Sequence, residues 1–135
     1  MSLHKSIVLD SWAIMAYVLN EPAAEQVADI IANAREENAR LLMSVINVGE
    51  VWYSLRRRSS ARNADEAMGA LRSIGIEFID ADWPQTQIAA QFKSRGGISY
   101  ADCFAAALAK QTSAILVTGD PEFKRLAKDI RIKWL

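Results

Sequence analysis

The sequence predicts an α/β fold in which a parallel sheet of about five strands is covered by helices on both faces. Short apolar runs alternate along the chain with longer segments whose apolar residues recur at helical spacing. Strands separated by helices pair in parallel, because each helix returns the chain to the edge where the next strand begins. The short connections and the length of 135 residues predict one domain, 1–135.

The N-terminal segment predicts a strand followed by two helices. The strand covers 6–10, where the apolar run SIVL ends in Asp10. Ser11 is expected to cap the helix that follows directly, over the segment WAIMAYVL. A second helix is expected to begin near Pro22, which suits a first helical turn, and to run to about residue 38.

The middle of the chain predicts two more strands and three more helices. A strand is expected over 41–43, and a helix over 44–59 follows from apolar residues at helical intervals. Another helix is expected over 63–73, and the alternating segment 76–79 predicts the third strand. A tryptophan-proline pair opens the next helix, over 83–94.

The C-terminal segment completes the sheet. Two glycines at 96–97 end the preceding helix, and Ser99 caps the helix YADCFAAALAK, whose alanines allow close packing. The run AILVT at 114–118 predicts a buried strand. Asp120 and the proline after it start a short helix, and the alternating segment 130–135 predicts a final edge strand.

Composition excludes several kinds of site. The 16 basic and 16 acidic residues balance, so the net charge gives no support to a nucleic-acid partner. The single cysteine, Cys103, cannot form an intramolecular disulfide and is expected to be a small buried side chain in a reducing compartment. The only histidine, His4, precedes the first predicted strand, so paired-histidine zinc sites and Ser-His-Asp triads both lack residues. Any metal ion is therefore expected to be bound by oxygen atoms.

The N-terminus predicts a cytoplasmic protein. The segment MSLHKSIVLD reaches an aspartate before the apolar region of a signal peptide could form. No apolar run approaches the roughly 18 residues that a membrane span needs. We therefore expect neither export nor a membrane partner.

Four acidic residues lie where strands end or helices begin. Asp10 ends the first strand, and Asp120 lies just after the fourth. Asp102 is in the first turn of its helix, and Glu50 is in the second turn of the helix that follows strand two. Because strand C-termini and helix N-termini share one edge of a parallel sheet, these four carboxylates are expected to converge.

Converging carboxylates predict a cation site. Each like-charged pair would cost on the order of 4 kcal/mol at about 4 Å and an effective dielectric near 20, and a divalent cation removes that cost. Ligation by oxygen alone favours Mg²⁺, for which Mn²⁺ can substitute. Such ions polarise phosphoryl oxygens and activate water, so phosphodiester hydrolysis is the predicted reaction.

Each acid also has a purely structural interpretation. Asp102 stands three residues after Ser99, which is the spacing of a capping box, and Asp120 precedes a proline and suits an N-cap. Glu50 could be solvated, and Asp10 could simply begin a turn. Capping and metal binding can coexist, so the four acids taken together carry more weight than any one of them.

Four segments resemble the signature segments of PIN domains: LDSWAIMAYVLNEP, SVINVGEVWYSL, SYADCFAAALAK and LVTGDPEF. The resemblance runs from residue 7 to about 134. More narrowly, the length, the N-x-x-E segment at Asn47 to Glu50 and the TGDPEF ending resemble VapC toxins of toxin-antitoxin pairs. The resemblance implies an α/β/α sandwich with strand order 3-2-1-4-5.

The same resemblance implies a Mg²⁺-dependent endoribonuclease that uses metal-activated water and leaves a 5′-phosphate. Its acidic positions match Asp10, Glu50, Asp102 and Asp120, which would be the catalytic and metal-binding residues. Polar positions that support the acids in the family match Ser11, Asn47 and Thr118. Alternatively, these three side chains only form hydrogen bonds with backbone groups at the strand and helix ends. The resemblance also implies a homodimer and an antitoxin that binds the early helices.

Basic and aromatic residues suggest where RNA could bind. Lys93 and Arg95, just before the Asp102 helix, are expected to bind the RNA backbone. The basic run 56–58 instead suits the end of its helix, because consecutive helical residues cannot all face one groove. Three aromatic residues are expected mainly in the core or an interface, with base stacking as the alternative: Trp12, Trp52 and Tyr53.

Other interpretations stay open on the residues alone. Asp80 and Asp82 also follow a strand and could reach the acidic edge. A haloacid-dehalogenase-type phosphatase would have a second aspartate two residues after Asp10, where Trp12 stands, and the spacings of a phosphoryl-accepting receiver are not clear. A module that binds RNA or protein without cutting is a further alternative, although it would have no reason to keep costly converging carboxylates.

Overall fold

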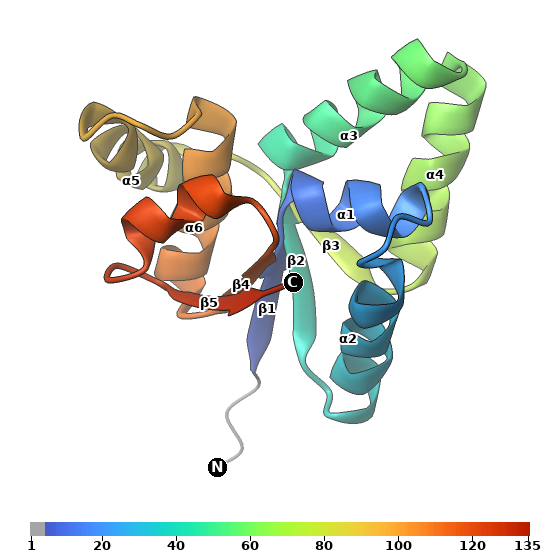
Figure 1. The fold of residues 1–135 in the computed structure, drawn as a ribbon, viewed down its shortest axis with the longest axis horizontal. Coiled ribbons are helices and arrows are strands. Elements are labelled where there is room, and N and C mark those ends of the chain that lie inside the picture. The colour runs from blue at the N-terminus through green and yellow to red at the C-terminus, as the bar shows by residue number, and fades with distance from the viewer. Residues whose placement is uncertain (1–4) are drawn as a thin grey trace.

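Five parallel strands form one sheet with β1 at its centre, in the order β3-β2-β1-β4-β5 (Figure 1). The computed structural model describes residues 5–135, so His4 lies outside the described residues. The strands are β1 (Ser6–Leu9), β2 (Arg40–Ser44), β3 (Ile76–Ile79), β4 (Ile115–Thr118) and β5 (Arg131–Trp134). The predicted fold class, the strand order and the edge position of the last strand are confirmed.

Six α-helices and one 3₁₀ helix connect the strands of the described chain. They are α1 (Ser11–Val18), α2 (Ala24–Glu36), α3 (Val45–Arg58), α4 (Ala61–Ser73), α5 (Trp83–Ser94), α6 (Tyr100–Thr112) and the 3₁₀ helix η1 (Pro121–Leu126). Most begin at a short polar side chain that accepts a hydrogen bond from a backbone N–H in the first turn. Ser99, for example, caps α6 as predicted.

Alternation along the strands divides the core into two layers, one on each face of the sheet. Val8 and Leu116 are paired in register and point toward α5, α6 and η1. Their neighbours Leu9 and Val117 are also paired and point toward α1, α2, α3 and α4. Figure 1 shows these two groups of helices on opposite sides of the sheet. Both faces are therefore covered, as parallel strands that are apolar throughout require.

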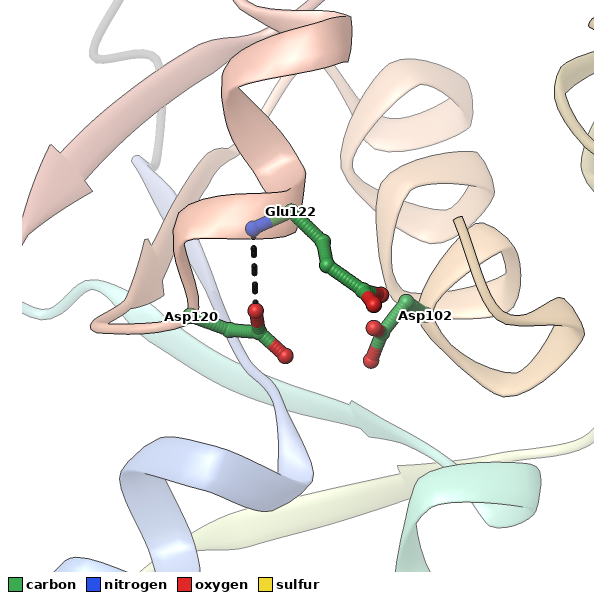
Figure 2. A group of neighbouring side chains, drawn as sticks. All are labelled: Asp102, Asp120 and Glu122. Atoms are coloured by element: carbon green, nitrogen blue, oxygen red, sulfur yellow. Dashed lines mark hydrogen bonds between the residues drawn. The ribbon is translucent and has the colours of Figure 1, made fainter. Parts of the chain in front are cut away.

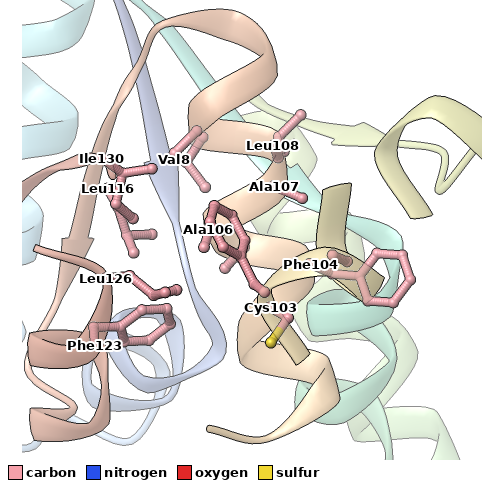
Figure 3. Close-up of a cluster of buried hydrophobic side chains, with 14 of the residues drawn as sticks. Val8, Cys103, Phe104, Ala106, Ala107, Leu108, Leu116, Phe123, Leu126 and Ile130 are labelled. Atoms are coloured by element: carbon pink, nitrogen blue, oxygen red, sulfur yellow. The ribbon is translucent and has the colours of Figure 1, made fainter. Parts of the chain in front are cut away.

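Helix α6 packs closely against the sheet because its inner face is built of small residues. Four alanines (Ala105, Ala106, Ala107 and Ala109) and Cys103 of this helix are buried, beside Leu116 of β4 (Figure 3). Cys103 is fully buried, as predicted, and burial raises the pKa of its thiol to about 11. Close packing of α6 fixes the position of its first turn, which carries Asp102.

Phe123 fixes the position of η1 in the same cluster. Its ring is fully buried between α6 and β4 (Figure 3). We expect Phe123→Ala to lower the free energy of unfolding by about 3–5 kcal/mol, as measured by urea denaturation. Phe78 is half-buried on edge strand β3, so Phe78→Ala is the matched control and should lower the free energy of unfolding by less. A loss below about 1 kcal/mol for Phe123→Ala would contradict this account of the core.

Several predicted boundaries are wrong, and the reasons are local. Helix α1 is capped by Asp10, whose side chain accepts a hydrogen bond from the Ala13 backbone N–H, and Ser11 is instead its first residue. Pro22 lies before α2, which begins at residue 24 and ends at 36. Helix α4 begins at residue 61 because Ser60 caps it, two residues earlier than predicted.

The described helices, within 5–135, include none that combines the length and the apolar character of a membrane span.

Candidate functional site

The acidic residues meet at the edge where the central strands end. Asp10 directly follows β1 and caps α1, and Asp120 follows β4 and caps η1. Asp102 lies in the first turn of α6, and Glu50 lies in the second turn of α3. Neighbouring parallel strands and the helices that follow them thus bring residues more than 100 positions apart in the chain to one place.

Three carboxylates form the tightest acidic group in the described chain. One oxygen atom from each of Asp102, Asp120 and Glu122 lies within 4.8 Å of the others. Figure 2 shows the three side chains converging from α6 and the start of η1, with the Glu122 backbone N–H donating to the Asp120 carboxylate at 2.9 Å. Capping by Asp120 therefore coexists with its place in the acidic group.

Sequence reasoning missed Glu122. The residue is exposed and stands two positions after Asp120, in the first turn of η1. Its position relative to η1 matches that of Asp102 relative to α6, since each lies in the first turn of the element that follows its cap. An acidic residue in that turn was the available signal, because first-turn side chains tilt back toward the helix N-terminus and so toward the sheet edge.

Asp10 lies behind this group and is fully buried. One carboxylate oxygen accepts from the Ala13 backbone N–H at 2.9 Å, and the other accepts from the Thr118 hydroxyl at 2.5 Å. The Thr118 oxygen in turn accepts from the Asp120 backbone N–H at 3.0 Å. Thr118 thus connects the first and last acids of the sequence and holds the ends of β1 and β4 together.

Burial and neighbouring charges raise two carboxyl pKa values. Burial raises the pKa of Asp10 from 3.8 to about 7, with smaller increases from the charges of Asp120 and Glu50. The hydrogen bonds from Thr118 and Ala13 lower it, but by less. An uncompensated charge at this position is therefore unfavourable in the absence of a cation.

Asp102 behaves in the same way. Its pKa is raised from 3.8 to about 7, mainly by burial and to a smaller extent by the charges of Asp120 and Asp10 and the contact with Glu122. Hydrogen bonding with the Ser99 side chain lowers it. The Ser99 hydroxyl also accepts from the Asp102 backbone N–H at 3.1 Å, so the predicted capping contact is present beside the acidic group.

Asn47 positions Glu50 from within the protein. Its fully buried side-chain amide donates to the Glu50 carboxylate and to the Ala101 carbonyl, each at 3.0 Å. The first bond lies within α3, and the second joins α3 to the first turn of α6. Its Oδ1 atom is buried without a hydrogen-bond partner among the described residues. Asn47 therefore fixes the distance between the helix of Glu50 and the helix of Asp102.

A cleft of about 810 Å³ opens over the acidic group. Five acids line it: Glu50, Asp102, Asp120 and Glu122 at the sheet edge, and Glu21 from the segment between α1 and α2. Its other wall is built of α1 and α3 and includes Ser11, Trp12, Tyr53 and Arg58. The cleft therefore has an acidic end at the sheet edge and a partly aromatic wall that leads away from it.

Lys93 and Arg95, expected to bind RNA, do not line this cleft. The Lys93 ammonium donates to the Ile98 carbonyl at 2.9 Å, and the Arg95 guanidinium pairs with Asp129 at 2.8 Å. Both residues are exposed, and their RNA-binding role stays a prediction.

Two other acids left open by the sequence also lie away from the cleft lining. Asp82 caps α5 by accepting from the Gln85 backbone N–H, and the Asp80 backbone carbonyl accepts from the Gln85 side chain. Of the predicted aromatic residues, Trp52 donates its indole N–H to Asp65 at 2.8 Å, a structural contact on α3 and α4.

The donor atoms of this site suit a hard divalent cation. The ligand candidates are all carboxylate oxygens, which Mg²⁺ and Mn²⁺ prefer. The raised pKa values of Asp10 and Asp102 report charge repulsion and burial that a bound cation would offset. Asp102, Asp120 and Glu122 are placed to contact an ion in the cleft, whereas Asp10 and Glu50 lie beside them.

Comparison with solved structures identifies similar folds. DNA-bound VapBC from Salmonella typhimurium has a TM-score of 0.79 at 21% sequence identity, covering 97% of this chain and 98% of that chain. VapBC2 from Rickettsia felis, bound to a promoter DNA fragment, has a TM-score of 0.76 at 18% identity, covering 95% and 97%. VapC20 from Mycobacterium tuberculosis, described as a sarcin-ricin loop cleaving toxin, has a TM-score of 0.72 at 18% identity, covering 92% and 95%.

A comparison with curated proteins gave no match. A family model described as the PIN domain matches residues 7–129, which is most of the chain. The sheet order and the VapBC and VapC structures with similar folds agree with that match. The chain belongs to the PIN domain family.

Proposed function

We propose that this protein is a Mg²⁺-dependent endoribonuclease and the toxin of a toxin-antitoxin pair. The observation that carries the proposal is the convergence of three carboxylates within 4.8 Å at one end of an open cleft, in a chain that belongs to the PIN domain family. An all-oxygen acidic site open to solvent suits a divalent cation and a phosphodiester substrate.

Each acidic residue has a distinct place in the proposed site. Asp102, Asp120 and Glu122 are positioned to contact the cation, and buried Asp10 supplies negative charge from behind. Glu50 faces the cleft from α3. A bound Mg²⁺ or Mn²⁺ would polarise the scissile phosphate and lower the pKa of the attacking water. Hydrolysis would then produce a 5′-phosphate and a 3′-hydroxyl.

Polar neighbours hold these carboxylates in place. Thr118 donates to Asp10 and accepts from the backbone of Asp120, and Asn47 donates to Glu50. Ser11 lines the cleft beside Asp10. Such supporting contacts orient metal ligands in proteins and change metal affinity when they are removed.

The proposed partners follow from the similar structures. The VapBC structures with similar folds support a cognate antitoxin as a partner. The proposal further includes an antitoxin that binds the early helices and a homodimeric toxin, as the resemblance to VapC toxins implies. The described action of VapC20 on the sarcin-ricin loop supports RNA as the substrate class. The RNA target of this chain is a separate question that its own cleavage products would answer.

Incubation of the purified chain with total RNA tests the proposal. We expect discrete cuts in Mg²⁺ and in Mn²⁺, none in EDTA, and none with Asp102→Asn. Asp80→Asn is the matched control, because Asp80 is exposed after β3 and does not line the cleft, and it should cut normally. A folded native chain that binds the metal but cuts no RNA would favour a binding module instead.

Asn47 provides a test of how Glu50 is positioned. We expect Asn47→Ala to weaken Mn²⁺ binding by about 10- to 100-fold, because the Glu50 carboxylate loses its buried donor. Asn47→Asp also removes the donor but adds a negative charge near the site, which attracts the cation, so it should lose less affinity than Asn47→Ala. Calorimetric titration with Mn²⁺ measures both variants. Unchanged affinity in both would show that Asn47 only joins α3 to α6.

A further inference from the structure

Trp12 is an exposed aromatic residue that packs against the backbone beside the acidic group. It is the second residue of α1, its side chain lines the cleft, and 39% of its surface is exposed. The six-membered part of its indole lies against Gly119, where a Cβ atom would come within 2.2–2.5 Å of three ring atoms. Only glycine at position 119 allows this approach, so the ring is pressed onto the backbone between Thr118 and Asp120.

This arrangement leaves part of a flat π surface open in the cleft, next to an acid. Gly119 immediately precedes Asp120, so the indole and the Asp120 carboxylate lie on neighbouring parts of the same cleft. A solvated aromatic ring of this size is unfavourable unless something covers it.

The same wall of the cleft continues with a second exposed aromatic ring and a cation. Tyr53 lies one helical turn beyond Glu50 on α3 and is 48% exposed. The Arg57 guanidinium lies over its ring, 5.5 Å from the centroid. Arg58, about 12 Å along α3 from Glu50 at 1.5 Å per residue, lines the far part of the cleft. Stacking surfaces followed by a cation are typical of sites for single-stranded nucleic acid.

We propose that Trp12 is the stacking platform for an unpaired base of the RNA, in the nucleotide next to the phosphate that is cut. The inference rests on the proposed nuclease function and specifies its substrate as single-stranded or looped RNA. A base suits this position better than a phosphate, because the base is neutral and five acids line the same cleft. Stacking needs a free base face, which a base in a duplex does not offer.

Binding of a single-stranded RNA tests the proposal. The probe is a pool of randomised 12-nucleotide RNAs with phosphorothioate linkages, bound to the full chain in Mg²⁺ and followed by fluorescence anisotropy. We expect Trp12→Ala and Trp12→Leu to weaken binding by about 5- to 140-fold, the range that base-aromatic stacking gives. Trp12→Phe, which keeps an aromatic face, should stay within about threefold of the native chain.

Two controls separate stacking from loss of the fold. Trp83→Leu removes a tryptophan that is 68% exposed on α5 and does not line the cleft, so RNA binding should not change. Mn²⁺ affinity should stay native in every Trp12 variant, and circular dichroism should show that each variant is folded at the temperature of the binding assay. RNA should also quench tryptophan fluorescence in the native chain, and this quenching should be lost in Trp12→Phe although binding remains.

Several outcomes would overturn the proposal, and they differ from failure of the nuclease. Native affinity in Trp12→Leu would mean that apolar contact, not stacking, is used. If the native chain bound a double-stranded RNA of the same length as tightly as the single-stranded pool, an unpaired base would not be required. Loss of antitoxin binding in Trp12→Ala with native RNA binding would assign the ring to a protein partner. A native chain that neither binds nor cuts RNA with metal present would refute the proposed function itself, and with it this inference.

Discussion

Asp10→Asn is expected to lower the rate of metal-dependent RNA cleavage by at least about 100-fold. Asp10 is the most buried of the acids and the one in contact with both ends of the site, through Ala13 and Thr118. Its replacement removes one negative charge from the position that faces Asp102 and Asp120 and so weakens attraction of a cation.

The fold is expected to survive this substitution. An asparagine has the same shape, and its carbonyl oxygen can still accept from the Ala13 backbone N–H, while its amide can donate to the Thr118 oxygen. Cleavage of labelled RNA measures the rate, Mn²⁺ titration measures the affinity, and circular dichroism verifies the fold. Asp80→Asn should retain native activity in the same assay. Full activity of a folded Asp10→Asn chain would remove Asp10 from the proposed site.

The metal-free protein is expected to become less stable as the pH rises from about 5 to 8. Asp10 and Asp102 have pKa values of about 7 in the folded chain, whereas an unfolded aspartate titrates near 3.9. Between these values the folded chain keeps protons that the unfolded chain has released, so the free energy of unfolding falls with rising pH. The fall should level off above pH 8. Over the full range from below pH 4 to above pH 8, the fall due to Asp10 alone is on the order of 4 kcal/mol.

Urea denaturation in EDTA at several pH values measures this dependence. Asp10→Asn should flatten the curve and should be more stable than the native chain at pH 8, because no buried carboxyl has to ionise at position 10. Mn²⁺ should stabilise the native chain most at high pH, since the ion binds the ionised carboxylates and competes with protons below pH 7. Native stability in EDTA that increases from pH 5 to 8 would contradict the raised pKa values.

Local sequence patterns were sufficient to predict the helices and strands and their order along the chain. The β-branched run before Asp10 and the AILVT run predicted the two central strands, because strands buried on both faces are apolar throughout. Helix boundaries were less well predicted where two adjacent residues could both cap. Asp10 and Ser11 are an example. Asp10 is the cap, and its side chain also accepts a hydrogen bond from Thr118 of β4, 108 positions away in the chain.

The sequence by itself therefore determined the parallel sheet, the strand ends at which four acids lie, and a ligand set made only of oxygen. Those properties follow from the periodicity of apolar residues and from residue type, which are local. Only the tertiary structure decided that Glu122 joins Asp102 and Asp120, and that Trp12 lies on Gly119. These contacts depend on how α6, η1 and α1 pack against the sheet, since angstrom distances between side chains of different elements are set by packing and not by local sequence.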